Sequence, residues 1–254
     1  MADRNDRIGV MDSGVGGVSV LRDMVKLLPK ERFIYLGDTK NAPYGTKQEE
    51  QIRALTVDAV SLLTKEGIKA LVIACNTATS ASEAALLERY DFPIIGIEPA
   101  LEAAQKVRSE DGVILSIATP GTIAGERYQK LAQRFGEGVH SIPCPGLMEF
   151  VERYEFDTPA LREYFEERFA PYAGEKVDAI TLGCTHYVFL KNALHKLYPD
   201  AQLLEGNGKV VDRLRQALEE RDALAPPDQE GSVELLSSGG EEAIRLMRTL
   251  LEQE

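Results

Sequence analysis

Residues 70–77 of this chain have the sequence Ala-Leu-Val-Ile-Ala-Cys-Asn-Thr, an apolar run that stops at Cys75. The run is apolar at both alternations of a strand, which is typical of a parallel strand covered on both faces. A second segment, residues 178–186, repeats the pattern as Asp-Ala-Ile-Thr-Leu-Gly-Cys-Thr-His and stops at Cys184. A helical pattern follows each cysteine. The sequence therefore predicts two units in which a buried strand ends at a thiol.

Outward from these two segments, short apolar runs alternate with helical patterns along the whole chain, which is the signature of an α/β fold. The predicted strands are residues 8–11, 33–36, 70–74, 94–97, 113–117, 139–142, 179–182, 202–204 and 233–236. The predicted helices are residues 17–28, 47–65, 79–90, 99–107, 122–135, 159–171, 188–197, 210–219 and 241–251.

Two breaks in this alternation suggest a division into domains. Glu98-Pro99 follows one strand and opens a new series, and the turn 206–208 (Gly-Asn-Gly) suits a return of the chain. We expect two similar α/β domains with mainly parallel sheets and helices on both faces. We expect residues 1–98 with 208–254 to form the first domain and residues 99–207 the second, and we expect the active site to lie in the cleft between them.

Composition narrows the classes of function. The chain has 254 residues and a formal net charge of −12, and no Lys/Arg cluster, which argues against a nucleic-acid surface. Its apolar runs are too short to span a bilayer, and no apolar signal-like run follows the first residues, so we expect a cytoplasmic protein without a membrane partner. The three cysteines are odd in number and widely spaced, which predicts free thiols and no structural zinc site.

The positions of Cys75 and Cys184 favour chemistry over packing. A free cysteine is often a small buried hydrophobe, but each of these two ends a strand and precedes a helix whose dipole favours thiolate. Two such thiols suggest one acid/base on either side of a substrate. His186 is near enough in sequence to poise the second thiol from the same loop. Cys144, between two prolines, is interpreted as structural.

Three further loops follow predicted strands, where ligands of parallel sheets bind. Asp12 begins a glycine-rich loop that does not fit the dinucleotide fingerprint. It either caps the next helix or orients a thiol or binds a substrate amine. Residues 41–46 have turn composition, and their backbone amides can bind a carboxylate. Thr119 opens a loop whose hydroxyls either cap a helix or bind a carboxylate.

Four motifs at these positions resemble those of the glutamate racemases, within the cofactor-independent amino-acid racemase superfamily. They are residues 12–17 (Asp-Ser-Gly-Val-Gly-Gly), 43–45 (Pro-Tyr-Gly), 74–79 (Ala-Cys-Asn-Thr-Ala-Thr) and 183–187 (Gly-Cys-Thr-His-Tyr). They occur in the family's order and at its usual spacing. The resemblance covers the chain from Ile8 to the last predicted helix.

The resemblance implies racemisation of L- and D-glutamate by two bases without a cofactor, in an enzyme that supplies D-glutamate for peptidoglycan and is a homodimer. Cys75 would act on D-glutamate and Cys184 on L-glutamate. Asp12 would support Cys75, and His186 would support Cys184 with Glu152 nearby, Glu149 being the competing acid. The expected substrate-binding residues are Asp12, Ser13, Tyr44, Gly45, Asn76, Thr77, Thr119, Thr185 and His186.

Other functions stay open from the residues alone. A racemase of aspartate or another amino acid would share the same motifs, because they do not specify the side chain of the substrate. A lyase or isomerase that uses one thiol is disfavoured because this chain keeps two. The same two cysteines argue against a non-catalytic binding protein. A pyridoxal-phosphate racemase is a further rival, but no segment resembles a family in which lysine anchors that cofactor.

Overall fold

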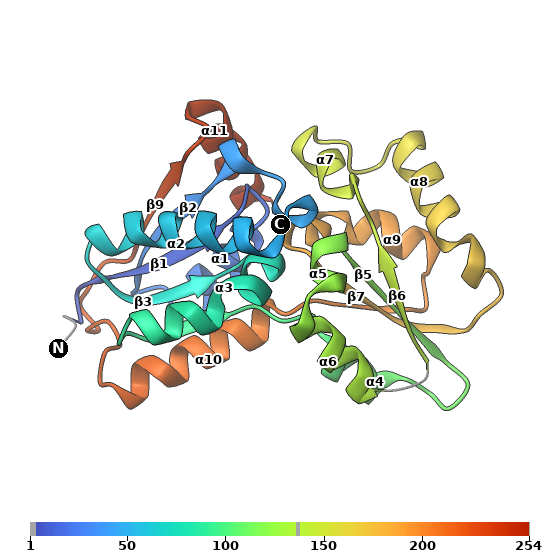
Figure 1. Ribbon diagram of the computed structural model, residues 1–254, viewed down its shortest axis with the longest axis horizontal. Coiled ribbons are helices and arrows are strands. Elements are labelled where there is room, and N and C mark those ends of the chain that lie inside the picture. The colour runs from blue at the N-terminus through green and yellow to red at the C-terminus, as the bar shows by residue number, and fades with distance from the viewer. Residues whose placement is uncertain (1–3, 136–137, 254) are drawn as a thin grey trace. The chain divides into compact units, whose positions relative to one another are not determined.

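The computed structural model describes residues 4–135 and 138–253, and within them the chain forms nine β-strands in two sheets (Figure 1). The strands are β1 (Arg7–Asp12), β2 (Arg32–Gly37), β3 (Ile68–Ile73), β4 (Ile94–Gly96), β5 (Val113–Ala118), β6 (Val139–Pro143), β7 (Val177–Gly183), β8 (Gln202–Leu204) and β9 (Ser232–Ser237). All nine predicted strands are present within a few residues of their predicted bounds.

The helices of the described residues alternate with these strands. They are α1 (Val18–Leu27), α2 (Glu49–Lys65), α3 (Asn76–Arg89), α4 (Leu101–Val107), α5 (Pro120–Ala124), α6 (Glu126–Phe135), α7 (Leu147–Glu152), α8 (Pro159–Phe169), α9 (Lys191–Leu197), α10 (Asn207–Glu220) and α11 (Glu241–Glu252). Short 3₁₀ segments are η1 (Thr39–Asn41), η2 (Tyr44–Thr46), η3 (Ala170–Tyr172) and η4 (Thr185–Leu190). None of these helices is long and apolar enough to cross a membrane.

The chain divides into two compact units, one running to Ile97 and resuming at Asn207, the other comprising Glu98–Gly206. These divisions fall one residue before the predicted ones. The first unit contains a five-stranded parallel sheet in the order β4-β3-β1-β2-β9. The second contains a four-stranded parallel sheet in the order β6-β5-β7-β8. The predicted fold class, two α/β domains built on parallel sheets, is confirmed.

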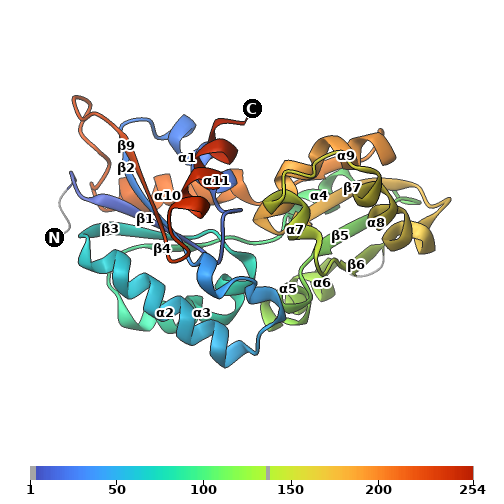
Figure 2. The same ribbon diagram turned by 90° about the horizontal axis from the view of Figure 1, so that it is seen from above.

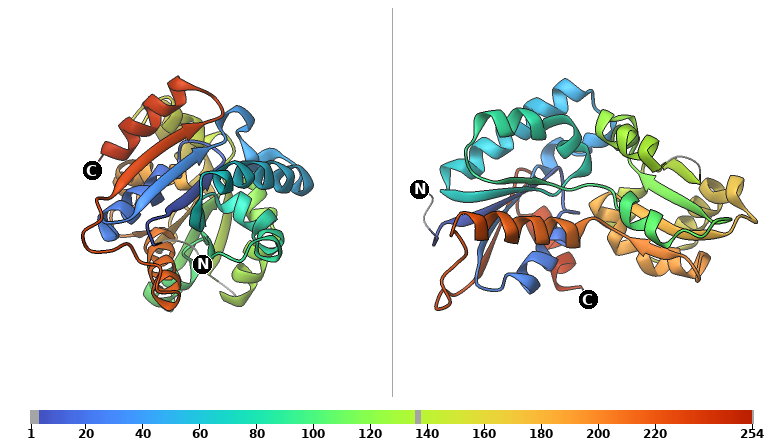
Figure 3. Two further views of the ribbon diagram at one scale, coloured as in Figure 1. Left: turned by 90° about the vertical axis from the view of Figure 1, so that its left-hand side faces the viewer. Right: turned by 90° about the horizontal axis from the view of Figure 1, so that it is seen from below.

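In the first unit the helices form a layer on each face of the sheet. α2 packs beside α3 on one face, while α1 contacts α10 and α11 on the other (Figure 2). The right-hand view of Figure 3 shows α10, in orange, on the opposite side of the sheet from α2 and α3. Every residue of β3 is buried, Lys69 included, and the apolar run from Ala70 predicts that burial.

In the second unit the chain passes from β5 to β6, then crosses back over β5 to β7 and β8. Because parallel crossovers are right-handed, this reversal places α6 on one face and α8 and α9 on the other. Leu101 and Ala104 of α4 pack with Tyr128 of α6 against Ile114 and Ala179 of the sheet. The predicted helix over residues 122–135 is two helices, because the chain is not helical at Gly125.

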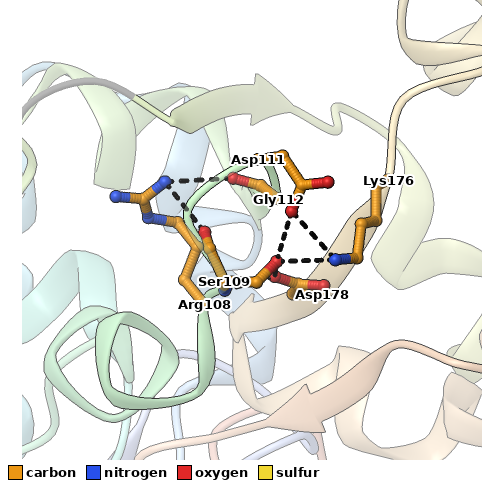
Figure 4. Close-up of polar contacts among 6 residues, drawn as sticks. All are labelled: Arg108, Ser109, Asp111, Gly112, Lys176 and Asp178. Carbon is orange, nitrogen blue, oxygen red and sulfur yellow. Dashed lines mark hydrogen bonds and ion pairs between the residues drawn. The ribbon is translucent and has the colours of Figure 1, made fainter.

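A polar cluster ties the amino ends of β5 and β7 together (Figure 4). The Ser109 hydroxyl donates to Asp178 and lies 3.1 Å from Asp111, and the Lys176 ammonium donates to Ser109 and Asp111, each at 2.9 Å. Lys176 lowers the pKa of Asp111, and Ser109 lowers that of Asp178. The cluster is at the end of the sheet opposite to Cys184, so we assign it to strand pairing.

Candidate functional site

Cys75 lies at the topological switch point of the first sheet. The helices that follow β1 and β3 leave towards opposite faces, so the carboxyl ends of these adjacent strands border a crevice where ligands of α/β sheets bind. Asp12 ends β1, and the Ala74 amide donates to the Met11 carbonyl at 2.8 Å, so the two strand ends are side by side. The structure thus brings Asp12, Ser13 and Cys75 to one edge.

The sulfur of Cys75 has polar neighbours. Ser13 Oγ lies 3.3 Å from Cys75 Sγ, and the Ala78 amide donates to that sulfur at 3.4 Å, which makes Cys75 the N-cap of α3. An amide donor and the positive end of a helix both favour thiolate over thiol. The 14 residues of α3 make this a genuine α-helical terminus, as predicted.

The loop after β1 is held by a chain of hydrogen bonds. The buried Asp12 carboxylate accepts from the Gly14 amide at 2.8 Å, and the Tyr35 hydroxyl donates to the Gly14 carbonyl at 2.8 Å. Burial, with the charges of Asp12 and Cys75, raises the pKa of Tyr35 well above its ordinary value. A Cβ on Gly17 would lie 2.6 Å from the Asp12 Cβ, so the closeness of the loop requires glycine there.

Asn76 is a buried amide whose side chain has no hydrogen-bond partner in the described part of the chain. Neither its Oδ1 nor its Nδ2 has a hydrogen bond within the described residues, although the side chain is buried. A buried unpaired amide is uncommon and calls for an explanation, and a polar ligand that offers both a donor and an acceptor would provide one. Thr77, next in α3, is also buried.

Tyr44 and Gly45 form the start of η2, a 3₁₀ turn rather than an irregular loop, and both are buried. The Tyr44 hydroxyl donates to Asp38 Oδ2 at 2.6 Å. Burial and this hydrogen bond raise the pKa of Tyr44, so the phenol stays protonated. The first amides of a helix have no acceptor inside it, so the amides here suit an anion.

Cys184 has the equivalent position in the second sheet. The helices that follow β5 and β7 leave towards opposite faces, so Thr119, after β5, and Cys184, after β7, flank the switch point of that sheet. The predicted helix over residues 188–197 is confirmed only from Lys191, where α9 begins, because η4, a 3₁₀ segment of six residues, lies between Cys184 and α9. The dipole of an α-helix therefore does not act directly on Cys184.

In the second unit His186, rather than a helix dipole, is the group that favours thiolate at the cysteine. Its Nδ1 lies 3.8 Å from Cys184 Sγ, and its Nε2 lies 3.4 Å from Glu152 Oε1, within ion-pair distance but outside hydrogen-bond geometry. Burial lowers the pKa of His186, but Cys184 and Glu152 outweigh it and raise the pKa to about 10. A protonated imidazole beside a sulfur stabilises thiolate.

The structure separates the two candidate acids of α7. Glu152 faces His186, whereas Glu149 pairs with Arg153, 3.3 Å from its guanidinium.

Thr119 caps α5: its hydroxyl oxygen accepts from the Thr122 amide at 3.2 Å, one of the two roles that its sequence allowed. Thr185 is buried beside His186.

The third cysteine differs from the other two. Cys144 is buried, its thiol donates to the Ile142 carbonyl at 3.5 Å, and burial raises its pKa to about 12. A thiol of that kind is inert near neutral pH.

Sequence reasoning missed Tyr35 and Asp38, which hold the loops after β1 and β2. Tyr35 is inside a predicted strand and looks like a core aromatic. Asp38 lies two residues after a predicted strand, residues 33–36, and that position near a carboxyl end was a signal that could have identified it.

Two parallel α/β units, each with a polar thiol at the switch point of its sheet, define a protein suited to acid–base chemistry on a small polar molecule. The family model described as Asp/Glu/Hydantoin racemase matches residues 8–214. The chain belongs to this family.

Individual relatives resemble the chain over nearly its full length. A glutamate racemase of Clostridium botulinum (strain Alaska E43 / Type E3) is 41% identical, with 99% of each chain covered. The crystal structure of a Bacillus anthracis glutamate racemase superimposes with a TM-score of 0.86 at 34% identity, covering 98% of this chain and 96% of that one. A glutamate racemase of Francisella tularensis, in complex with D-glutamate, has a TM-score of 0.85 at 25% identity, with 99% and 95% covered.

Proposed function

We propose that this protein interconverts L-glutamate and D-glutamate by proton transfer between two cysteines, without a cofactor. One observation carries the proposal: a thiol with its own polar partner lies at the switch point of each sheet. Cys75 is beside Ser13 and the N-terminus of α3, and Cys184 is beside His186. A racemase needs such a pair, because one group must remove a proton and another must supply one to the opposite face.

The reaction balances with these two groups alone. The Cys75 thiolate takes the α-proton of D-glutamate, and the electron pair of the broken C–H bond stays on the α-carbon, delocalised into the carboxylate. The Cys184 thiol then donates its proton to the opposite face and becomes thiolate, which yields L-glutamate. In the reverse direction the roles exchange. Asp12 supports Cys75, while His186 and Glu152 support Cys184.

Donors around the substrate carboxylates stabilise the charge that develops on the α-carbon. The unpaired amide of Asn76 and the first amides of η2 are suited to this task. We assign substrate binding to the residues at the strand ends and the turns that follow them: Asp12, Ser13, Tyr44, Gly45, Asn76, Thr77, Thr119, Thr185 and His186.

The choice of glutamate rests on the relatives. A protein named glutamate racemase matches 99% of this chain at 41% identity, and one relative was crystallised with D-glutamate. We further propose that the product supplies peptidoglycan synthesis in the cytoplasm and that the protein is a homodimer. Sedimentation equilibrium of the purified protein tests the dimer, and a monomer at micromolar concentration would exclude it.

The first experiment incubates the protein with L-glutamate and, separately, D-glutamate in D₂O. Circular dichroism follows racemisation, and NMR follows deuteration of the α-carbon. The wild-type protein should racemise and deuterate both enantiomers, and Cys75→Ala and Cys184→Ala should each abolish racemisation. Cys144→Ala is the matched control, because it removes the buried thiol outside the site and should retain activity.

The same assay with aspartate distinguishes the alternative racemase. Turnover of aspartate and none of glutamate would replace the proposed substrate. Racemisation that survives in either Cys75→Ala or Cys184→Ala would exclude the two-thiol mechanism.

A further inference from the structure

The buried carboxylate of Asp38 connects three side chains at the carboxyl end of the first sheet. Its Oδ2 accepts from the Tyr44 hydroxyl at 2.6 Å, and its Oδ1 accepts from the Ser238 hydroxyl at 2.7 Å. The Asn41 amide lies 3.0 Å from both oxygens. Asp38 is 6% exposed, so these are charge-assisted hydrogen bonds in a largely water-excluded place.

The Ser238 end of this connection belongs to the turn after β9, about 200 residues further along the chain. β9 pairs in parallel with β2, with Gly37 opposite Ser237, which delivers that turn beside Asp38. The Lys40 amide donates to Ser238 Oγ at 3.0 Å, and the Ser238 amide donates to the Gly37 carbonyl at 3.1 Å. The C-terminal strand therefore supports the segment that leads to Tyr44.

A second set of contacts reinforces the same junction. Thr39 Oγ1 and Ser237 Oγ are 2.6 Å apart, and the Gly239 amide donates to Thr39 Oγ1 at 3.0 Å. A Cβ on Gly239 would lie 2.3 Å from Thr39 Oγ1, so the turn approaches η1 closely. The junction between the turn 237–239 and η1 is thus built from several short polar contacts.

Tyr44 is the residue on which this arrangement acts. Because its hydroxyl is committed to Asp38, the side chain is fixed, and with it the start of η2. The amides at the start of η2 are the groups that the proposed function uses to bind a substrate carboxylate. Their position depends on Asp38 and, through Asp38, on Ser238.

We propose that Asp38 is a positioning residue, and that its hydrogen bonds to Tyr44 and Ser238 hold η2 in the geometry that binds the substrate. The inference rests on the proposed glutamate racemase function and deepens it. It assigns to the C-terminal turn a part in substrate affinity, although that turn contributes no reacting group.

Ser238 provides the sharper test, because it is exposed and its replacement leaves the core intact. Ser238→Ala should raise KM for both enantiomers by about three- to tenfold, the loss expected for one ordinary hydrogen bond, with kcat within about twofold of wild type. Ser238→Thr keeps the hydroxyl and should restore KM. Ser232→Ala, at the other end of β9, is the matched control and should behave as wild type.

Asp38→Asn removes one of the two acceptor oxygens and should raise KM more than Ser238→Ala does. In a Tyr44→Phe background the same change should have a much smaller effect, because the bond that it weakens is already absent. Wild-type protein that does not racemise glutamate would refute the proposed function and this inference together. Racemisation by the wild type, with Ser238→Ala indistinguishable from Ser232→Ala in KM, would overturn this inference alone.

Discussion

At the residue scale, the most consequential group after the two thiols is the imidazole of His186. Two neighbours, Cys184 and Glu152, raise its pKa to about 10 against the opposing effect of burial. His186 is therefore protonated at neutral pH and supplies positive charge beside the sulfur. Because the folded pKa exceeds the ordinary value of about 6.5, its stabilising contribution is full below that value and declines as pH rises towards 10.

Glu152→Gln should shift the alkaline limb of kcat/KM to lower pH. The variant removes one of the groups that raise the pKa of His186, so the imidazole loses its proton at a lower pH. Glu149→Gln, on the same helix but paired with Arg153, is the control and should leave the limb in place. A pH–rate profile in which the two variants move the limb equally would refute the assignment of Glu152.

Asn76→Ala should separate affinity from stability. The amide has no hydrogen bond within the described residues, so its removal costs the fold no internal bond. We expect an unchanged or slightly raised Tm, together with a KM about tenfold higher because the substrate loses a polar partner. Calorimetry and steady-state kinetics measure the two quantities, with the exposed Asn192→Ala as control. A fall in Tm without a change in KM would show that Asn76 serves the fold.

At the scale of elements, strands were predictable and side-chain partners were not. Apolar runs mark the buried central strands, and parallel topology then places the last residues of these strands at one edge, which is why Cys75 and Cys184 could be singled out. The helix α7 was not predicted, because six residues after a left-handed Gly146 are too few to show a helical period. That helix carries Glu152, so the local pattern did not place this carboxylate near His186, and only the family resemblance did.

The contacts of Asp38 were hidden for a different reason. They depend on β9 adding to the edge of the first sheet beside β2, a pairing between segments about 200 residues apart. Local pattern identifies the strand but not its neighbour, since strand order depends on how the whole unit buries its apolar faces. The same limit applies to the buried ion pair between Lys69 of β3 and Glu31.

Lys69→Met should destabilise the first unit strongly. The Lys69 ammonium lies 2.7 Å from Glu31 Oε2 and also donates to the carbonyls of Arg4 and Ala223. Both side chains are almost fully buried, so removal of the cation leaves an uncompensated carboxylate, at a cost of about 3–5 kcal/mol. Urea denaturation measures the change, and the exposed Lys65→Met should alter the free energy of unfolding by less than about 0.5 kcal/mol. Equal effects of the two variants would contradict this role.

At the scale of the whole molecule, the two units differ in how the chain builds them. Glu98–Gly206 is one continuous segment with its own sheet and its own buried residues from α4 and α6. The other unit is completed only by the return of the chain, because α10 and α11 cover α1, and β9 pairs with β2. The Asn207 amide donates to Asp23 of α1 at 3.1 Å at the point of that return.

A fragment of residues 98–206 should therefore fold alone, whereas a fragment of residues 1–97 should not. The first keeps all four strands of its sheet, and a domain of about 100 residues buries enough apolar surface to be stable. The second loses β9, which pairs with β2, and the helices α10 and α11, which pack against α1. A cooperative thermal transition by circular dichroism is expected for the first fragment only. Since the folded fragment holds Cys184 without Cys75, it should leave both enantiomers of glutamate unchanged, and racemisation by it would show that one thiol suffices.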